Sequence, residues 1–547
     1  MEEDSIIYVD ADATDGEETG ESWADAYTDL QDALEVAGAS DQIWVAEGTY
    51  LPTSTIDRAV SFVINNGVRV YGGFVGNETA LSQRDIVENE TILSGNIGAD
   101  TQADNSYHVV DITDSPTSTL IDGFTIAEGQ ADGDPGFGRR QDRGAGLVGL
   151  SNASATLQNL IIENNFAAGD GGGIYVEDTG ITIDSVIFDR NSAGTNGGAI
   201  FASGNDLNIF NSLFFDNQAA GSGGGAISTN SIATSNFINN TFYDNQGGGS
   251  DDIFDDSGSF NTKTITNNIF ADSDTIDDTK VFLDFSVTPE ILDINTNIID
   301  GTVGFRRNNI GVGDFGENNI DEEPLFVDPD EGDFRLRRNS PGVDAGNEDV
   351  ADEDGTDLVG NPRIYGDTVD IGAYEYGLYL DIEDSRLLEG DEEDRRMRFN
   401  VTLSDSLDLA TDDEVTVRYT TVDRNAKDEQ DYTGVEGTLT FDAETDTLPI
   451  FVPIIGDTRP EVSESFFVNL SRPTGGAVIN DGQAQGTIVN DDQLPVGVES
   501  DRFFAPDVDA SFYTPTAAER AEILSIIPEL ELAGADGLAF LFEPSAS

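Results

Sequence analysis

The sequence predicts an all-β protein made of a parallel β-helix, a β-sandwich that follows it, and a short C-terminal tail. Three observations predict this fold class. A glycine-rich motif recurs every 26 or 27 residues, short segments of alternating apolar and polar residues follow once the repeats end, and 59 of the 547 residues are glycine, which is typical of many turns. We expect residues 1–60 to form an N-terminal cap, 61–376 the β-helix, 377–493 the sandwich and 494–547 the tail.

The predicted cap contains a short helix followed by a strand. In "SWADAYTDLQDALEVAGASDQIWVAEGTY" one helical face would hold Ala26, Leu30, Ala33 and Leu34. Such a helix would cover the open end of a β-helix, which otherwise exposes apolar strand edges.

Two markers that keep step with each other define the repeat. The first is a glycine motif, "GAGL", "GGGI" or "GGAI", which begins at Gly144, Gly171, Gly197 and Gly224. The second is "IIEN", "FDRN", "FFDN" or "FYDN", which ends at Asn164, Asn191, Asn217 and Asn245. Because asparagine side chains at equivalent positions can hydrogen-bond along a stack, we interpret these four as structural.

Within one repeat the pattern is that of a strand with a corner. In "GITIDSVIFDRN" the apolar residues are Ile181, Ile183, Val186 and Phe188. Their alternation slips near Asp184 and Ser185, so we expect the chain to turn there. Helical spacing does not explain the pattern.

These motifs resemble known families. The GGAI and FxxN pairs are similar to polymorphic outer-membrane protein repeats. The opening "YVDADA…SWADAYTDLQDAL" and the closing "EPLFVDPDEGDFRLRRNSPGVDAGN…DIGAYEY" resemble bacterial surface proteins of the pectate-lyase-like superfamily. The resemblance spans residues 6 to about 376 and implies a right-handed parallel β-helix. It implies no single function, because that superfamily includes lyases, hydrolases, adhesins and inert stalks.

Six strand-like segments after residue 377 predict the sandwich: "RMRFNVTL", "EVTVRYTTV", "EGTLTF", "LPIFVPII", "ESFFVNLS" and "AQGTIVN". The same stretch resembles a Calx-β domain, an immunoglobulin-like fold, in the motifs "LLEGD", "DYTGVEGTLTF", "VPIIGDTRPEVSESFFVNLS" and "GTIVNDD".

The Calx-β resemblance implies a Ca²⁺ site at one end of the sandwich. Its candidate ligands are Glu389, Asp431, Asp457, Glu461, Glu464, Asp491 and Asp492. Carboxylates from several loops could supply the six to eight oxygens that Ca²⁺ prefers. One departure is Gly456, where calcium-binding members often have an acidic residue, so fewer ions are implied. The alternative is that these acids are solvated and bind no ion.

The sequence of the tail predicts a short helix followed by a strand. In "TPTAAERAEILSII" Thr516 and Glu519 form a capping box, and Pro528 ends the run. The apolar segment "GLAFLFE" would pack on the sandwich or pair with an edge of another copy of the chain.

The composition restricts the possible partners. The formal net charge is −80, from 106 acidic and 26 basic residues, of which three are lysine. A surface this acidic repels nucleic acid and anionic lipid, so we expect neither as a partner. The acidity fits adaptation to high salt, a need for divalent cations, or both. We expect no disulfide, because the chain has no cysteine. We also expect no membrane helix and no signal peptide. If the protein is exported, the sequence would therefore be that of its mature form.

Few residues could act as a catalytic base on the β-helix. The only histidine, His108, lies in a strand-like context and is interpreted as a packed or surface residue and not as a base. The basic group Arg139, Arg140 and Arg143 lies in a glycine-rich loop and could contact a glycan carboxylate. The alternative is a solvated loop whose arginines pair with neighbouring acids. Glu163, Asp189 and Asp216 recur beside the asparagine markers, so we interpret them as repeat positions. No catalytic residue is assigned.

We therefore predict an exported, acidic, calcium-binding surface or extracellular-matrix protein with a structural or adhesive role, located outside the cell. Polysaccharide and other surface components are the expected partners. Two alternatives stay open: a polysaccharide lyase or hydrolase on the β-helix, and a self-assembling filament or sheath subunit joined through the tail.

Overall fold

The computed structural model describes residues 5–14, 16–64, 67–98, 101–113, 115, 119–135, 140–151, 153–256, 262–273, 279–284, 291–300, 302–306, 318–350, 355–365, 368–390, 395–404, 414–442, 445–459, 463–475, 477–491, 501–505, 510–514 and 531–532. The chain divides into two units, Met1–Tyr376 and Gly377–Ser547. Each unit is described separately.

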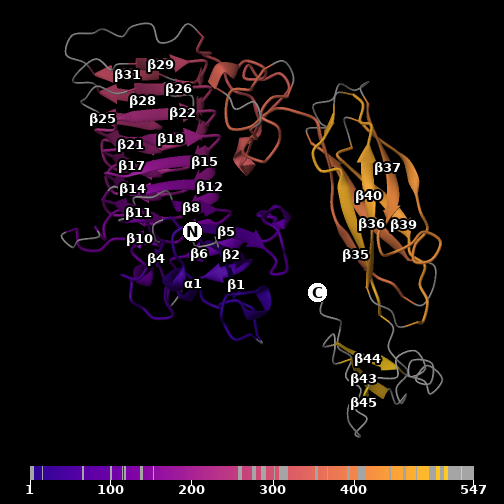
Figure 1. The fold of residues 1–547 in the computed structure, drawn as a ribbon. Coiled ribbons are helices and arrows are strands. Elements are labelled where there is room, and N and C mark those ends of the chain that lie inside the picture. Colours follow the sequence, from indigo (N-terminus) through magenta and orange to yellow (C-terminus); the bar gives the residue numbers. More distant parts are fainter. Residues whose placement is uncertain are drawn as a thin grey trace. The chain divides into compact units, whose positions relative to one another are not determined.

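The first unit is a parallel β-helix, as the sequence predicts (Figure 1). Its described residues form three parallel sheets, of 17, nine and five strands. The largest sheet comprises β1 (Ile6–Val9), β2 (Gln42–Ala46), β3 (Gly48–Tyr50), β5 (Arg69–Phe74), β6 (Thr91–Ser94), β8 (Thr119–Asp122), β9 (Thr125–Ala127), β12 (Ser154–Glu163), β15 (Gly180–Asp189), β18 (Leu207–Phe210), β19 (Leu213–Phe215), β22 (Thr234–Ile238), β23 (Thr241–Tyr243), β26 (Thr262–Thr266), β27 (Ile269–Ala271), β29 (Ile291–Asn295) and β30 (Ile298–Ile299).

The other two sheets complete each coil, meaning one circuit of the chain around the β-helix. The nine-stranded sheet comprises β4 (Phe62–Val63), β7 (Val110–Asp111), β11 (Leu147–Leu150), β14 (Ile174–Glu177), β17 (Ile200–Ser203), β21 (Ile227–Asn230), β25 (Ile253–Asp256), β28 (Thr279–Asp284) and β31 (Thr302–Arg306). The five-stranded sheet comprises β10 (Gln130–Ala131), β13 (Phe166–Ala167), β16 (Ser192–Ala193), β20 (Gln218–Ala219) and β24 (Gln246–Gly247).

Equivalent residues of successive coils stack on one another. Ile183 pairs with Leu157 on one side and Ile209 on the other. In the interior, four phenylalanine rings stack with centroids 4.6 to 4.8 Å apart, namely Phe188, Phe214, Phe242 and Phe270. The corner predicted near Asp184 and Ser185 is present, because Ser185 has a φ of 56° in the middle of β15. This stacking buries each coil's apolar face against its neighbours.

An asparagine ladder runs through the coils, with its first member one residue later than predicted. Asn165, Asn191, Asn217 and Asn245 are linked by amide hydrogen bonds of 3.1, 3.1 and 3.0 Å. Asn164 was the expected first member, but it is exposed and has a φ of 54°. It occupies the left-handed turn position that precedes the ladder, and Asn165 follows it into the interior.

A second ladder was not predicted. The amides of Asn240, Asn268, Asn297 and Asn319 are joined by hydrogen bonds of 2.9, 3.1 and 3.0 Å. It lies at the corner between consecutive strands of one coil, such as β22 and β23.

The short helix α1 (Leu30–Val36) packs its buried Leu30, Ala33 and Leu34 into the core of the first coils. Ala26, expected on the same helical face, is buried but precedes the helix, next to η1 (Trp23–Asp25). The remaining 3₁₀ turns are η2 (Leu81–Gln83), η3 (Gln102–Asp104), η4 (Pro329–Glu331) and η5 (Glu348–Val350). Among the described residues, no helix has the length and apolarity needed to cross a membrane.

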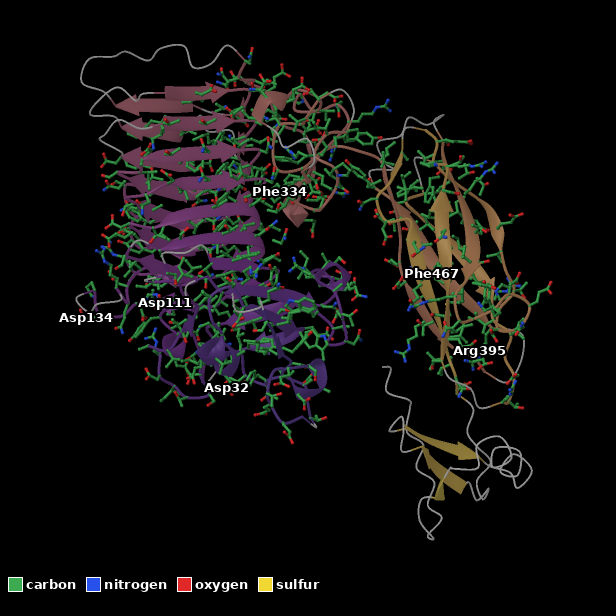
Figure 2. The ribbon with its side chains drawn as sticks, in the orientation of Figure 1. Asp32, Asp111, Asp134, Phe334, Arg395 and Phe467 are labelled. Carbon is green, nitrogen blue, oxygen red and sulfur yellow. The ribbon has the colours of Figure 1, made fainter. Side chains whose placement is uncertain are left out.

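The last part of the first unit packs on the outside of the β-helix. It contains the antiparallel pair β32 (Phe326–Asp328) and β33 (Asp333–Leu336). Phe334 and Tyr374 from this segment join an apolar cluster with Tyr243 and Ile269 of the coils. In Figure 2, Phe334 lies between this segment and the stacked coils.

Buried carboxyl groups tie this segment together. The Glu375 carboxyl accepts the backbone N–H of Tyr365 at 2.9 Å and of Asp370 at 3.0 Å, and Asp370 accepts that of Tyr376 at 2.6 Å. Burial and the neighbouring Asp370 raise the pKa of Glu375 to about 9, and burial raises the pKa of Asp370 to about 7. Buried Arg363 donates to the Gly372 carbonyl oxygen at 2.6 Å.

The second unit contains a β-sandwich whose core is formed by both sheets. One sheet comprises β39 (Thr447–Pro453), β36 (Arg396–Leu403), β34 (Tyr379–Ile382) and β41 (Val478–Ile479). The other comprises β35 (Ser385–Leu388), β42 (Gln483–Val489), β40 (Glu464–Ser471), β37 (Val415–Asp423) and β38 (Glu436–Phe441). All six segments predicted as strands are strands, and β34, β35 and β41 were not predicted.

The tail contains a small sheet that was not predicted, formed by β43 (Asp501–Ala505), β44 (Ala510–Thr514) and β45 (Glu531–Leu532). The helix predicted from Thr516 to Pro528 and the predicted strand in "GLAFLFE" both lie outside the described residues.

The ladder assignment predicts unequal effects of two neighbouring substitutions. Asn165→Ala leaves the Gly129 N–H and the Ile126 carbonyl oxygen without the side chain that now bonds them, at 2.8 and 3.0 Å. Because both groups are buried, we expect a loss of about 2–4 kcal/mol in the free energy of unfolding. Asn164→Ala changes an exposed residue and should cost about 1 kcal/mol, from its left-handed backbone. Guanidinium unfolding of both variants checks this, and equal losses would contradict it.

The raised carboxyl pKa values predict that the first unit loses stability as the pH rises. In the unfolded chain these groups titrate near pH 4, so their protonated folded form is stabilising below that pH. This contribution is lost as the pH passes about 7 for Asp370 and about 9 for Glu375. We expect the first unit's thermal midpoint to fall between pH 6 and pH 9.5, measured in high salt. Glu375→Gln should flatten the upper part of this fall, and a midpoint that rises over the same interval would contradict the prediction.

Candidate functional site

The loops that hold the predicted calcium ligands meet at one end of the sandwich. β35 and β42 are parallel and both end there, with Leu388 paired to Val489. β40 begins there, because its first residue Glu464 pairs with Ile488 of β42. β37 and β39 also end there, and the following loops are joined by a bridge between Tyr432 and Ile454. In Figure 2, Arg395 lies at this end of the sandwich. We call it the acidic end, defined by residues 389–390, 395, 423–434, 454–459, 463–464 and 489–491.

Three of the predicted ligands lie on adjacent chain segments. The Glu389 N–H donates to the Val489 carbonyl oxygen at 2.9 Å, and the Gly390 N–H donates to the Asp491 carboxylate at 2.9 Å. Glu464 begins the strand next to β42. The structure therefore brings Glu389, Glu464 and Asp491 to neighbouring positions at the acidic end.

Two more predicted ligands lie in the facing loops. The Asp431 carboxylate accepts the Lys427 N–H at 2.7 Å, and its carbonyl oxygen accepts the Ile455 N–H at 3.0 Å. The exposed Asp457 carboxylate accepts the Arg459 N–H at 2.6 Å. Glu461 and Asp492 lie outside the described residues.

Sequence reasoning missed two carboxylates at the acidic end. Asp423, the last residue of β37, accepts the Asp428 N–H at 2.9 Å and the Tyr432 hydroxyl at 2.8 Å. These two hydrogen bonds hold the pKa of Asp423 below its usual value. Asp428 accepts the Gly434 N–H at 2.6 Å. A carboxylate directly at the end of a strand that leads into this loop was the available signal.

Basic side chains also reach the acidic end. Arg395 donates to the Leu388 carbonyl oxygen at 2.9 Å, and Lys427 lies 4.0 Å from the Asp423 carboxylate. Within the described part of the chain, no group of three acidic or histidine side chains is arranged to hold a metal ion. The chemistry of the donors fits Ca²⁺, because all are oxygen ligands. The carboxylates of Asp431, Asp457 and Asp491 each accept a backbone N–H, so the loops meet at this end while these carboxylates do not surround a single point.

The predicted glycan-contacting arginines of the β-helix unit are engaged with its own acids. Arg140 donates to the Tyr175 hydroxyl at 2.6 Å and forms an ion pair with Glu177 at 2.6 Å. Arg143 forms an ion pair with Asp170 at 2.9 Å. Arg139 lies outside the described residues. His108 is buried with its Nδ1 2.9 Å from the Gly144 carbonyl oxygen, which agrees with its interpretation as a packed residue.

A groove that the sequence did not indicate lies across the coils. It is a cavity of about 490 Å³ whose lining includes Glu90, Glu128 and Glu163. The Ser94 hydroxyl donates to Glu128 at 2.8 Å and the Thr125 hydroxyl donates to Glu90 at 3.2 Å, so two of these carboxylates are held in place. An adjoining hollow of about 370 Å³ adds Arg190, among others.

The acids beside the ladder fall into two columns rather than one. Glu163 pairs in register with Asp189, but Asp189 pairs with Phe215, so Asp216 occupies the following position. Burial raises the pKa of Asp189 to about 6, although Arg190 opposes this shift.

Models of two protein families match segments of the chain, one family in each unit. The family model of the Calx-beta domain matches residues 382–492. The second unit contains a Calx-beta domain. The model of the Chlamydia polymorphic membrane protein repeat matches residues 159–177 and 185–203 of the β-helix, where the stacked markers lie. No curated protein matches the chain.

Solved structures are similar to parts of the chain. The CBD12 structure from CALX1.2 is 21% identical with a TM-score of 0.19; the match spans 21% of this chain and 46% of that one, less than half its length. The apo-form Calx CBD1 domain is 21% identical over 21% of this chain and 100% of that one, with a TM-score of 0.18. Pectate lyase Pel9A is 15% identical over 68% of this chain and 96% of that one, with a TM-score of 0.36.

Proposed function

We propose that the chain is an acidic surface or extracellular protein with a structural or adhesive role, in which the Calx-beta domain binds Ca²⁺ at its acidic end. The observation that supports this most is the convergence of four carboxylate-bearing loops at that end. The polymorphic membrane protein repeats of the first unit support a surface location.

The proposed role of Ca²⁺ follows from the charges of these loops. Glu389, Asp431 and Asp491 are like charges on separate segments, so they repel one another unless a cation lies between them. Bound Ca²⁺ would supply that positive charge and would join the loops through their carboxylates. In the absence of an ion, the hydrogen bonds from backbone N–H groups hold the carboxylates of Asp431 and Asp491 in position.

Calcium should therefore stabilise the sandwich and leave the β-helix unchanged. With free Ca²⁺ at about 100 times its dissociation constant, the gain is about 2.7 kcal/mol, which for a domain of this size corresponds to a rise of roughly 10 °C in its thermal midpoint. Calorimetry of the full chain, with Ca²⁺ or with a chelator, separates the transitions. If chelation leaves every transition in place, the chain binds no stabilising calcium.

Matched variants locate the site. Asp431→Asn and Asp491→Asn keep an acceptor oxygen for their backbone partners but remove a charge, so the calcium-dependent rise should shrink. The control is Asp481→Asn, because Asp481 precedes β42 and therefore lies at the opposite end of the sandwich. A calcium response lost equally in the control variant would place the site elsewhere.

We also propose a neutral polysaccharide as the partner of the β-helix unit. The groove is lined by three glutamates, which repel uronate carboxylates but can accept hydrogen bonds from sugar hydroxyls. The arginines Arg140 and Arg143 are already paired with acids, so a uronate would have to displace those partners.

This partner predicts a charge preference in binding. Neutral polysaccharide should co-sediment with the protein in the presence of a chelator, whereas polygalacturonate should stay in solution. Replacing both Glu90 and Glu128 with glutamine should raise the binding of polygalacturonate, because it removes two repelling charges. Binding of polygalacturonate by the unchanged protein, or of no polysaccharide at all, would contradict the proposal.

A further inference from the structure

Two of the three lysines in the chain are buried inside the β-helix unit. Lys263 has a relative exposure of 1% and Lys280 of 0%. Burying an ammonium group costs several kcal/mol unless a carboxylate accompanies it. Both lysines have one: Lys263 forms an ion pair with Asp255, and Lys280 forms one with Asp272. The chain has 106 acidic and 26 basic residues, of which three are lysine, so two of its few lysines are placed in the interior beside carboxylates.

Lys280 lies in a group of aspartates. Its Nζ contacts the carboxylate of Asp272 and lies 3.5 Å from Asp251. Asp252, which has no exposed surface, lies in the preceding coil, and its N–H donates to the Lys280 carbonyl oxygen at 3.1 Å. Asn245, the last amide of the first ladder, donates to the Asp252 carboxyl at 3.0 Å. The ladder therefore ends against this group.

Burial also sets the protonation state of Asp252. Burial raises its pKa to about 8, against the attraction of Lys280, so the carboxyl is neutral at pH 7. Its Oδ2 accepts no hydrogen bond from the described residues, and neither does Oδ1 of Asp272. A protonated carboxyl thus lies in the strand register next to Lys280, which is fully buried and in contact with the 11% exposed side chain of Asp272.

We propose that Lys280 and Asp272 are joined by an isopeptide bond, formed between Nζ and Cγ with Asp252 as the proton donor and acceptor. In the first step a proton passes from the Lys280 ammonium group to the Asp272 carboxylate with which it is in contact, and this leaves the nitrogen with a free electron pair. The amine nitrogen then attacks Cγ of the neutral acid. Asp252 gives its proton to the departing hydroxyl, which leaves as water, and takes the surplus proton from the nitrogen. One C–N bond forms, one C–O bond breaks, and no oxidant is needed.

Lys263 provides an internal comparison. Its Nζ also donates to the Ser235 hydroxyl at 2.8 Å, and Asp255 accepts the Thr229 hydroxyl at 2.8 Å. Hydroxyl groups stabilise this pair as ions, and they are far weaker acids than a carboxyl. We therefore expect Lys263 to remain an ion pair while Lys280 reacts.

A covalent link here would close the chain between residues 272 and 280, at the point where the ladder stops. The chain has no cysteine, so no disulfide can supply such a link. Cross-linking a short loop restricts the unfolded chain and thereby stabilises the folded one.

Intact-mass spectrometry of the purified full chain tests the proposal. We expect a mass lower than the sequence mass by one water molecule. Trypsin should not cleave after Lys280, and fragmentation of the peptide from Thr264 to Arg306 should yield no breaks between residues 272 and 280. A water lost to a succinimide would leave cleavage after Lys280 intact, so cleavage there, or the full sequence mass, would overturn the proposal.

Three variants assign the roles. Lys280→Arg and Asp252→Asn should both have the full sequence mass, and circular dichroism checks that they fold. Lys263→Arg should still lose one water. If Asp252→Asn loses water as the unchanged chain does, Asp252 is not the proton donor. If Lys263→Arg has the full sequence mass, the bond is formed by Lys263 and not by Lys280.

Discussion

Side-chain amides that hydrogen-bond from one coil to the next fix the register of the β-helix, and the rest of the unit depends on that register. Asn217 donates to the Phe188 carbonyl oxygen at 2.9 Å and to Asn245 at 3.0 Å, while its oxygen accepts the Asn191 N–H at 3.1 Å. All these groups are buried, so a slip of one residue would leave them unpaired at about 1–3 kcal/mol each. The stacked phenylalanines, by contrast, would tolerate a shift, because apolar contacts are not directional.

The period of the repeat and the strands of the sandwich were predictable, because alternation and spacing are visible in the sequence. The exact ladder residue was not: "ENN" offers two asparagines, and only backbone conformation decides that Asn164 turns and Asn165 points inward. At the acidic end, the resemblance indicated five described carboxylates that the fold does bring to one end. Asp423 and Asp428 escaped notice because, in a chain with 106 acidic residues, they look like any solvated acid.

Scarce positive charge explains where many of the cations lie. Lys263 neutralises the buried carboxylate of Asp255, and Arg143 pairs with the nearly buried Asp170. Burying an unpaired carboxylate costs several kcal/mol, so a basic side chain stabilises the protein more beside a buried carboxylate than beside an exposed one. At the acidic end, Arg395 donates to a carbonyl oxygen and Lys427 stands 4.0 Å from its carboxylate, so direct neutralisation there is weak. The proposed Ca²⁺ would add positive charge to these loops.

The end of the first ladder shows how a repeat position can acquire chemistry. From Asn165 to Asn245 each amide meets another amide, which is neutral and unreactive. After Asn245 the next partner is the carboxyl of Asp252, with Lys280 and Asp272 beside it. The same hydrogen-bonding role is thus taken over by ionisable groups that the stack keeps away from water. The neighbouring coils fix the positions of an acid, Asp252, a nucleophile, Lys280, and an electrophile, Asp272. Because little translational and conformational entropy remains to be lost when they react, the arrangement favours reaction between them.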